Sequence, residues 1–371
     1  MKSLGLILML ITFAASAAPL REITLALMVE DPTPGILKPT YPMVEAAVEL
    51  AIKERAAELK KMGLKLSLLR YQMPEDPLQT IPVVKRILEE GSIAGIGLPV
   101  SLYASIGARV LQGTDYVMVS PYATSTELIE NAPNLLLFSA TNAQLAAGVE
   151  GFAKKIGKKK PAFIVAWDRP YCQNFYNSFS EEFKNSGKLF KVLEGRSDSQ
   201  SVAEEVVASN PDVVVIPNFA PTTAPYIKAL GKLGFHGPFL ASDSWGEDNK
   251  GDLMRLTQGL KFEGYTLRQY SKHALSPGAK KVQAKLEKTS KEEFRVIPLM
   301  FYDSANYLID RILEAGPNVT RKKVLELAAA KRTYEGVSTL SCLSNLKCPG
   351  QSFTVLRVTE RGYAPVSKFS Q

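Results

Sequence analysis

The hydrophobic pattern of the chain alternates between two periods from residue 23 onward. Short apolar runs such as ITLALMV at 23–29 are typical of buried strands, and segments such as 42–62, with apolar residues three or four positions apart, are typical of helices. The first part is predicted to contain strands at 23–29, 64–71, 93–98 and from 117, and helices at 42–62, 78–90 and 101–111. This order predicts a parallel sheet covered on both faces.

The same alternation begins again after residues 135–139. It predicts strands at 162–166, 189–193, 213–217 and 239–241, and helices at 143–156, 175–185, 202–209 and 222–233. We therefore expect an α/β protein of two doubly wound lobes. Ligands bind to such sheets outside the carboxyl ends of the strands, so the two lobes are expected to share one cleft.

The last hundred residues have helical patterns at 279–288, 298–315 and 320–330 and a strand pattern, FTVLRV, at 353–358. The helices have no parallel sheet of their own, so we expect them to return to the first lobe and the last strand to the second. The predicted first lobe is 18–140 plus 269–350, and the predicted second lobe is 141–268 plus 351–371. The chain then crosses between the lobes several times, as a multi-strand hinge.

The first residues have the pattern of a signal peptide. Lys2 precedes an apolar run at 4–14, and Ala15-Ser16-Ala17 has the small-x-small arrangement of a cleavage site. The run is shorter than the roughly 20 apolar residues of a membrane span, and no later stretch reaches that length. We expect residues 1–17 to be removed and the mature chain to be exported, soluble and periplasmic, with no cysteine near the cleavage site for a lipid anchor.

Composition and charge argue against a disordered chain and against a nucleic-acid-binding protein. The 371 residues are 46% hydrophobic and 22% charged, which is ordinary for a globular chain of two domains. The formal charge of +8 is dispersed, and the densest run, at 154–160, ends a predicted helix just before Pro161. A solvated helix terminus is favoured there over a nucleic-acid site, because no aromatic residues are interleaved with the lysines.

Cysteine spacing predicts one disulfide. Cys342 and Cys348 lie in the short segment SCLSNLKCPG, and an oxidising compartment favours their pairing. A metal site is the alternative, but two thiols without a nearby histidine fall short of the usual ligand set. Cys172 is left unpaired and is interpreted as a small buried residue rather than a catalytic thiol, since neither His236 nor His273 has a visible relation to it.

The stretch VMVSPYATSTEL at 117–128 is the first candidate for a binding site. A strand that ends in hydroxyl residues beside a helix start leaves N–H and O–H donors facing the same way, which suits an anion such as a carboxylate. Ser, Thr and Pro also form ordinary turns and helix caps, and that alternative stays open.

Four segments carry a resemblance to a known family: SPYATSTEL at 120–128, WDRPYCQNF at 167–175, GPFLASDSW at 237–245 and FYDSANYLIDRILEAG at 301–316. In order and spacing they resemble the type I periplasmic binding proteins, specifically the Leu/Ile/Val-binding branch. The resemblance covers nearly the whole mature chain. It implies a monomeric solute-binding protein, without enzymatic activity or cofactor, that closes on an amino acid or related small ligand and presents it to an ABC permease in the membrane.

The resemblance also implies ligand-binding residues. In that branch, hydroxyls and N–H groups of one lobe hold the α-carboxylate of the ligand, and an acid of the other lobe holds the α-ammonium. Matched residue by residue, Ser101, Ala123 and Thr124 fall at the carboxylate positions and Asp243 at the ammonium position.

Three aromatic residues complete the implied site. Tyr41 falls in the first-lobe loop that covers the ligand side chain, and Tyr171 and Phe219 fall on the second-lobe side of the cleft. Each matched residue also has an ordinary structural role open to it, as a cap, a turn residue or a packing residue.

Departures from the family pattern keep a second class of function open. Val100-Ser101-Leu102 stands where family members have consecutive serines, Cys172 replaces a glycine, and the segment DPTPGILKP at 31–39 lacks the usual glycine-rich first loop. These changes favour, as the alternative, a two-lobed regulator that senses a ligand, or binds none, and contacts another protein. An enzyme is disfavoured, because the chain has no G-x-S-x-G elbow, zinc-type histidine spacing or glycine-rich phosphate loop.

The signal-peptide pattern gives a direct test. N-terminal sequencing of the mature protein from the exporting cell is expected to begin near Ala18. Recovery of the mature protein with Met1 retained would contradict the prediction.

Overall fold

The computed structural model describes residues 19–30, 41–246, 252–289, 294–337, 339–345, 348–360 and 362–370, without the side chains of Glu30, Tyr41 and Asp252. The predicted signal peptide and the segment 31–39 lie outside the described residues. No helix in the described ranges is long and apolar enough to cross a membrane.

The first lobe is built on a five-stranded parallel sheet of order β2-β1-β3-β4-β5. Its strands are β1 (Arg21–Glu30), β2 (Leu64–Met73), β3 (Ala94–Ile96), β4 (Met118–Ser120) and β5 (Leu135–Leu137). Its helices are α1 (Tyr41–Lys61), α2 (Thr80–Glu89), α3 (Ser101–Leu111) and α4 (Glu127–Asn131) and, from the late part of the chain, α11 (Pro277–Thr289), α12 (Ile297–Ala315) and α13 (Arg321–Ala330).

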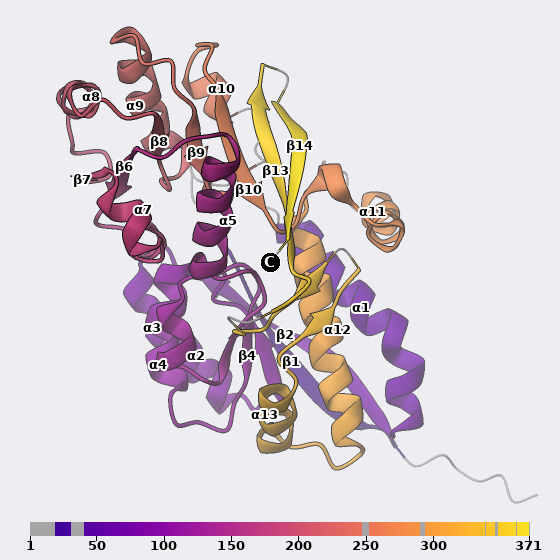
Figure 1. Cartoon of the computed structure of the whole chain (residues 1–371). Coiled ribbons are helices and arrows are strands. Elements are labelled where there is room, and N and C mark those ends of the chain that lie inside the picture. Colours follow the sequence, from indigo (N-terminus) through magenta and orange to yellow (C-terminus); the bar gives the residue numbers. More distant parts are fainter. Residues whose placement is uncertain are drawn as a thin grey trace, which may run out of the picture.

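Alternation along the strands places these helices on opposite faces. Leu25 and Leu27 of β1 belong to one apolar cluster with α1, α11, α12 and α13, whereas Ala26 and Met28 belong to another with α2, α3 and α4. Successive side chains of a strand point to opposite faces, so a strand that is apolar throughout is buried on both. Figure 1 shows α12 beside α1 in the lower lobe, although they are far apart in the sequence.

The second lobe is built on a seven-stranded sheet of order β14-β13-β10-β9-β8-β6-β7 (Figure 1). Its parallel strands are β6 (Pro161–Ala166), β7 (Lys188–Val192), β8 (Val213–Val215), β9 (Phe239–Ala241) and β10 (Gly264–Arg268), and β13 (Ser352–Thr359) and β14 (Gly362–Ser370) run antiparallel at one edge. Its helices are α5 (Asn142–Lys155), α6 (Pro170–Asn177), α7 (Glu181–Asn185), α8 (Ser199–Ala208), α9 (Ala220–Lys232) and α10 (Asp252–Leu256). Two doubly wound lobes are thus confirmed.

One predicted helix is wrong. The structure has two helices, α6 and α7, in place of the single helix expected at 175–185. The first begins earlier, with Pro170 at its first position, where proline is tolerated because its missing N–H needs no partner. The second begins after Ser180, whose hydroxyl accepts the N–H of Phe183 as a helix cap. The hydrophobic pattern did not predict β14 or a small hairpin of β11 (Tyr334–Glu335) with β12 (Leu340–Ser341).

The chain crosses between the lobes three times, after β5, after β10 and after β12 (Figure 1). One side chain joins all three crossings. Gln269, in the second, accepts the N–H of Ala140 in the first at 2.5 Å through Oε1. It also donates from Nε2 at 3.1 Å to the carbonyl oxygen of Leu340 in β12, directly before the third. These two hydrogen bonds connect the segments of the hinge to one another. The exact residue limits of the two lobes remain predictions.

The disulfide lies beside the third crossing. Cys342 and Cys348 are bonded, with their Cα atoms 5.9 Å apart, as predicted. Between them, Ser344 exchanges two hydrogen bonds with Leu137 at the end of β5, which attaches the loop to the first lobe. Cys172 is buried and unpaired, and burial raises the pKa of its thiol, which agrees with a packing role.

A buried carboxyl lies beneath the hinge. Asp303 of α12 is fully buried and accepts the N–H of Val337 at 3.0 Å; a hydrogen bond from Tyr270 also reaches it, and Tyr270 contacts the hydroxyl of Ser341 at 2.9 Å. Burial raises the pKa of Asp303 to about 7, although both hydrogen bonds lower it. Gly336 is required here, since a Cβ on it would lie 2.2 Å from Asp303 Oδ2.

Removing the two hydrogen bonds of Gln269 should destabilise the protein. Gln269→Leu leaves the N–H of Ala140 and the carbonyl of Leu340 without this partner, and we expect the free energy of unfolding to fall by about 2 kcal/mol. Urea unfolding measures it. Gln200→Leu, which removes only an exposed contact to Glu204, is the matched control and should change stability by less than about 0.5 kcal/mol. Equal effects of the two substitutions would contradict the role assigned to Gln269.

The raised pKa of Asp303 predicts a pH dependence. The folded chain holds this proton more tightly than the unfolded chain, whose aspartate pKa is about 3.9, so the contribution of this group to stability is lost as the pH rises from about 4 to 7. Asp303→Asn stays neutral throughout. We expect the wild type to lose up to about 4 kcal/mol relative to the variant between pH 4 and 8, measured by urea unfolding at each pH. A difference that does not vary with pH would disprove this assignment.

Candidate functional site

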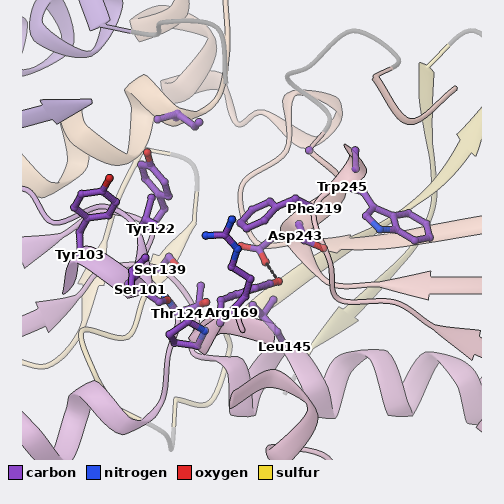
Figure 2. Close-up of a pocket in the computed structure, with 18 of the residues that line it drawn as sticks. Ser101, Tyr103, Tyr122, Thr124, Ser139, Leu145, Arg169, Phe219, Asp243 and Trp245 are labelled. Atoms are coloured by element: carbon purple, nitrogen blue, oxygen red, sulfur yellow. Dashed lines mark hydrogen bonds between the residues drawn. The ribbon is translucent and has the colours of Figure 1, made fainter. Parts of the chain in front are cut away.

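A cavity of about 590 Å³ lies between the lobes and is lined by residues of both (Figure 2). This volume is in the range of small-molecule sites, about 300–1,000 Å³. Ser101, Thr124 and Ser139 reach it from segments after β3, β4 and β5, and Tyr171 and Asp243 reach it from segments after β6 and β9. The cavity therefore lies at the carboxyl ends of both sheets, where parallel α/β sheets bind ligands.

The first-lobe wall offers hydroxyl donors. Ser101 begins α3, and its Oγ accepts the backbone N–H groups of Thr124 and Ser125, both at 3.3 Å. An oxygen that already accepts two N–H groups keeps its own proton to donate. The Thr124 hydroxyl is buried and has no hydrogen-bond partner within the described chain. These two hydroxyls, of which Ser101 is on the first residue of α3, can thus donate to an anionic oxygen.

The second-lobe wall offers a carboxylate. Asp243 is half-buried two residues after β9, and its Oδ1 accepts the hydroxyl proton of Tyr171 at 2.9 Å. Burial, and then the negative charge of Asp243, raise the pKa of Tyr171 well above 10, so the tyrosine stays a donor. The Tyr171 hydroxyl also contacts Ser242, and Arg268 donates to the backbone oxygen of Asp243 at 2.5 Å. The carboxylate is held in place and suits a cation.

Aromatic rings enclose the space between these walls. Phe219 stacks on Tyr171, with ring centroids 5.8 Å apart and an interplanar angle of 27°. Tyr103 and Tyr122 line the first-lobe side and Trp245 lies beyond Asp243 (Figure 2). Rings of this kind cover apolar parts of a ligand, while the hydroxyls and the carboxylate fix its orientation.

An ion pair lines the same cavity. Arg169, directly before α6, forms an ion pair with Glu194, which follows β7. Figure 2 shows the Arg169 side chain extending into the cavity toward Phe219 and Asp243. Within the described ranges, no three or more His, Cys, Asp or Glu side chains are grouped so that they could hold a metal ion.

Five of the residues singled out from the sequence meet in this cavity: Ser101, Thr124, Tyr171, Phe219 and Asp243. Two others do not join them in the described structure. Ala123 is buried but does not line the cavity, and its N–H donates to Ser120 Oγ at 3.4 Å. Tyr41 is the first residue of α1, and its side chain lies outside the described residues.

Sequence reasoning missed several lining residues, notably Ser139, Arg169, Glu194 and Trp245. The sequence contains a signal for most of them, which is their position shortly after a predicted strand. Ser139 and Glu194 come two residues after their strands, and Arg169 comes three residues after β6, so a survey of every strand end would have found them. Trp245 is the last residue of the segment GPFLASDSW.

The comparisons with known proteins give one family and one fold. Residues 28–362 match the family model described as "Periplasmic binding protein". No curated protein matches the sequence.

Solved structures share the fold over nearly the whole chain. A leucine-binding protein from Thermotoga maritima is 19% identical, with 94% of this chain and 98% of the other covered and a TM-score of 0.73. A branched-chain amino acid transporter substrate-binding protein from Streptococcus pneumoniae, in complex with isoleucine, is 15% identical, with 95% and 99% covered and a TM-score of 0.72. An ABC transporter solute-binding protein from R. palustris, in complex with 4-hydroxybenzoate, is 18% identical, with 94% and 97% covered and a TM-score of 0.72.

Proposed function

The chain belongs to the periplasmic binding protein family, whose members are solute-binding proteins and not enzymes, and on that premise we propose that it binds an amino acid or a related small polar solute. The binding site is the cavity between the lobes. The protein would deliver the solute to an ABC importer in the membrane. It would act as a monomer outside the cytoplasm, in the periplasm, where the family functions.

The observation that carries this proposal is the opposition of two kinds of polar group across the cavity. The hydroxyls of Ser101 and Thr124 face it from the first lobe and the carboxylate of Asp243 from the second. An amino acid carries a carboxylate and an ammonium on one carbon, and these groups complement the two walls. Ser101 and Thr124 therefore hold the carboxylate and Asp243 holds the ammonium.

Binding at this position couples the ligand to closure. A solute that contacts both walls makes its full set of interactions only when the lobes approach, so it favours the closed state by the free energy of the added contacts. The rings of Tyr171 and Phe219 then separate its apolar part from water.

Aromatic acids are the second candidate. The structural neighbours include solute-binding proteins in complex with 4-hydroxybenzoate and with benzoate, and both ligands carry a carboxylate without an ammonium. The stacked rings of Tyr171 and Phe219 favour such a ligand. Asp243 favours an amino acid, because a benzoate has no ammonium to pair with this carboxylate.

A thermal-shift screen with amino acids, amides and aromatic carboxylates separates these candidates. A ligand at one hundred times its Kd stabilises the folded state by about 2.7 kcal/mol and raises the melting temperature. A shift with amino acids supports the proposal, and a shift with benzoates alone replaces the amino acid by an aromatic acid. No shift with any compound would favour the regulator that contacts another protein.

The role of Asp243 gives the sharpest prediction. Removing one partner of a desolvated charge pair strands the other, at about 3–5 kcal/mol. Because about 1.4 kcal/mol is tenfold in affinity, Asp243→Ala should weaken amino-acid binding by roughly a hundredfold to a few thousandfold, measured by calorimetry. Asp243→Asn should do less harm, and Thr124→Ala should weaken binding by about 1–3 kcal/mol through loss of one hydroxyl contact.

The control for charge is Asp115→Ala, which removes an exposed acid of the first lobe outside the cavity and should leave binding unchanged. Circular dichroism establishes that each variant is folded. If Asp243→Ala binds the amino acid within threefold of the wild type, Asp243 holds no ammonium and this part of the proposal fails.

A further inference from the structure

Arg169 is a charged cavity-lining residue to which the amino-acid site described above gives no role. It stands directly before α6, two residues before Tyr171, and forms the ion pair with Glu194. Its side chain lines the cavity and extends into it from the second lobe (Figure 2). A guanidinium in such a place can donate to a third group of the ligand.

Arg169 is positioned by Glu194, whose own side chain and backbone are fixed by hydrogen bonds. The ion pair joins Arg169 Nη2 to Glu194 Oε2. The other oxygen of Glu194, Oε1, accepts the hydroxyl proton of Thr222 at 2.6 Å. The N–H of Glu194 donates to both carboxylate oxygens of Asp168 at 3.2 Å, which fixes its backbone. Glu194 therefore positions the arginine and balances its charge.

One donor of Arg169 lacks an acceptor in the described part of the chain. Arg169 Nε is buried and has no hydrogen-bond partner among the described residues. Buried donors of native proteins are almost always paired, and an unpaired donor on a charged group is especially unfavourable. Glu194 Oε2 is likewise buried without a hydrogen-bond partner among the described residues, so Nε and this oxygen can satisfy each other. The Arg169 side chain is 37% exposed, and its remaining N–H groups are the donors left for what occupies the cavity.

We propose that Arg169 recognises the far end of the solute, so that the ligand is an amino acid whose side chain ends in an oxygen acceptor. The inference rests on the proposed function, because it takes the backbone groups of the ligand to be held by Ser101, Thr124 and Asp243. A carboxamide and a carboxylate share the required oxygen. The carboxamide fits better, since Glu194 already balances the charge of Arg169 and would repel a second anion.

The cavity has space for such a side chain. Its volume of about 590 Å³ lies in the middle of the range for small-molecule sites. Arg169 and Asp243 both belong to the second lobe, so a ligand whose ammonium is at Asp243 can direct its side chain along the stacked rings of Tyr171 and Phe219 toward the guanidinium.

The test compares L-glutamine, L-glutamate and the apolar analogue L-norleucine by calorimetry on the full mature chain. A hydrogen bond to a charged group predicts that glutamine binds the wild type about 10- to 150-fold more tightly than norleucine. In the double variant Arg169→Met, Glu194→Gln, which removes both charges together, the two ligands should bind within threefold of each other. Arg196→Met, an exposed arginine outside the cavity, should leave the preference intact.

Each outcome of this comparison supports or overturns the role of Arg169. Preference for glutamine in the wild type and its loss in the double variant support the inference, and preference for glutamate with the same loss assigns the oxygen to a carboxylate. Norleucine binding as tightly as both polar ligands, or a preference that survives in the double variant, overturns it while the proposed function stands. Failure of every amino acid in the screen overturns both.

Discussion

The side chain of Gln269 connects the three crossings that link the lobes, and the geometry of the binding cavity depends on it. Its one acceptor is used on Ala140 and its donor on Leu340, so each crossing is placed relative to the other two. Gln269 and the next residue, Tyr270, also line the cavity. The hinge is therefore one wall of the cavity, so the segments that link the lobes also line the proposed binding site.

Much of the fold follows from the hydrophobic period. The helix expected at 101–111 agrees with α3, because apolar residues three or four positions apart are typical of helices. The strand expected at 239–241 agrees with β9, because a continuous apolar run is typical of a strand buried on both faces. The errors have local causes. The break between α6 and α7 depends on the cap at Ser180, and β14 alternates buried and exposed residues too weakly for its pattern to be recognised in isolation.

The site could be predicted only in part. Asp243 and Thr124 were found because they lie in segments with a recognisable order of residues, and both line the cavity. Ala123, one position away, does not, since its N–H is used by Ser120. Arg169 and Glu194 come from segments after two different strands, and only the sheet, which pairs β6 with β7, brings them together. A pair that exists through tertiary structure leaves no period or spacing in the sequence.

The sharing of late elements between the two lobes constrains how the chain can be assembled. The first sheet depends on α12 to cover one face, and the second depends on β13 and β14 to complete an edge, yet all three come from the last quarter of the sequence. During synthesis, neither lobe has its whole core until that segment emerges. Domains ordinarily fold as units from the N-terminus, but these two must finish almost together. A ribosome-bound fragment that lacks the last hundred residues would therefore expose apolar surface on both lobes at once.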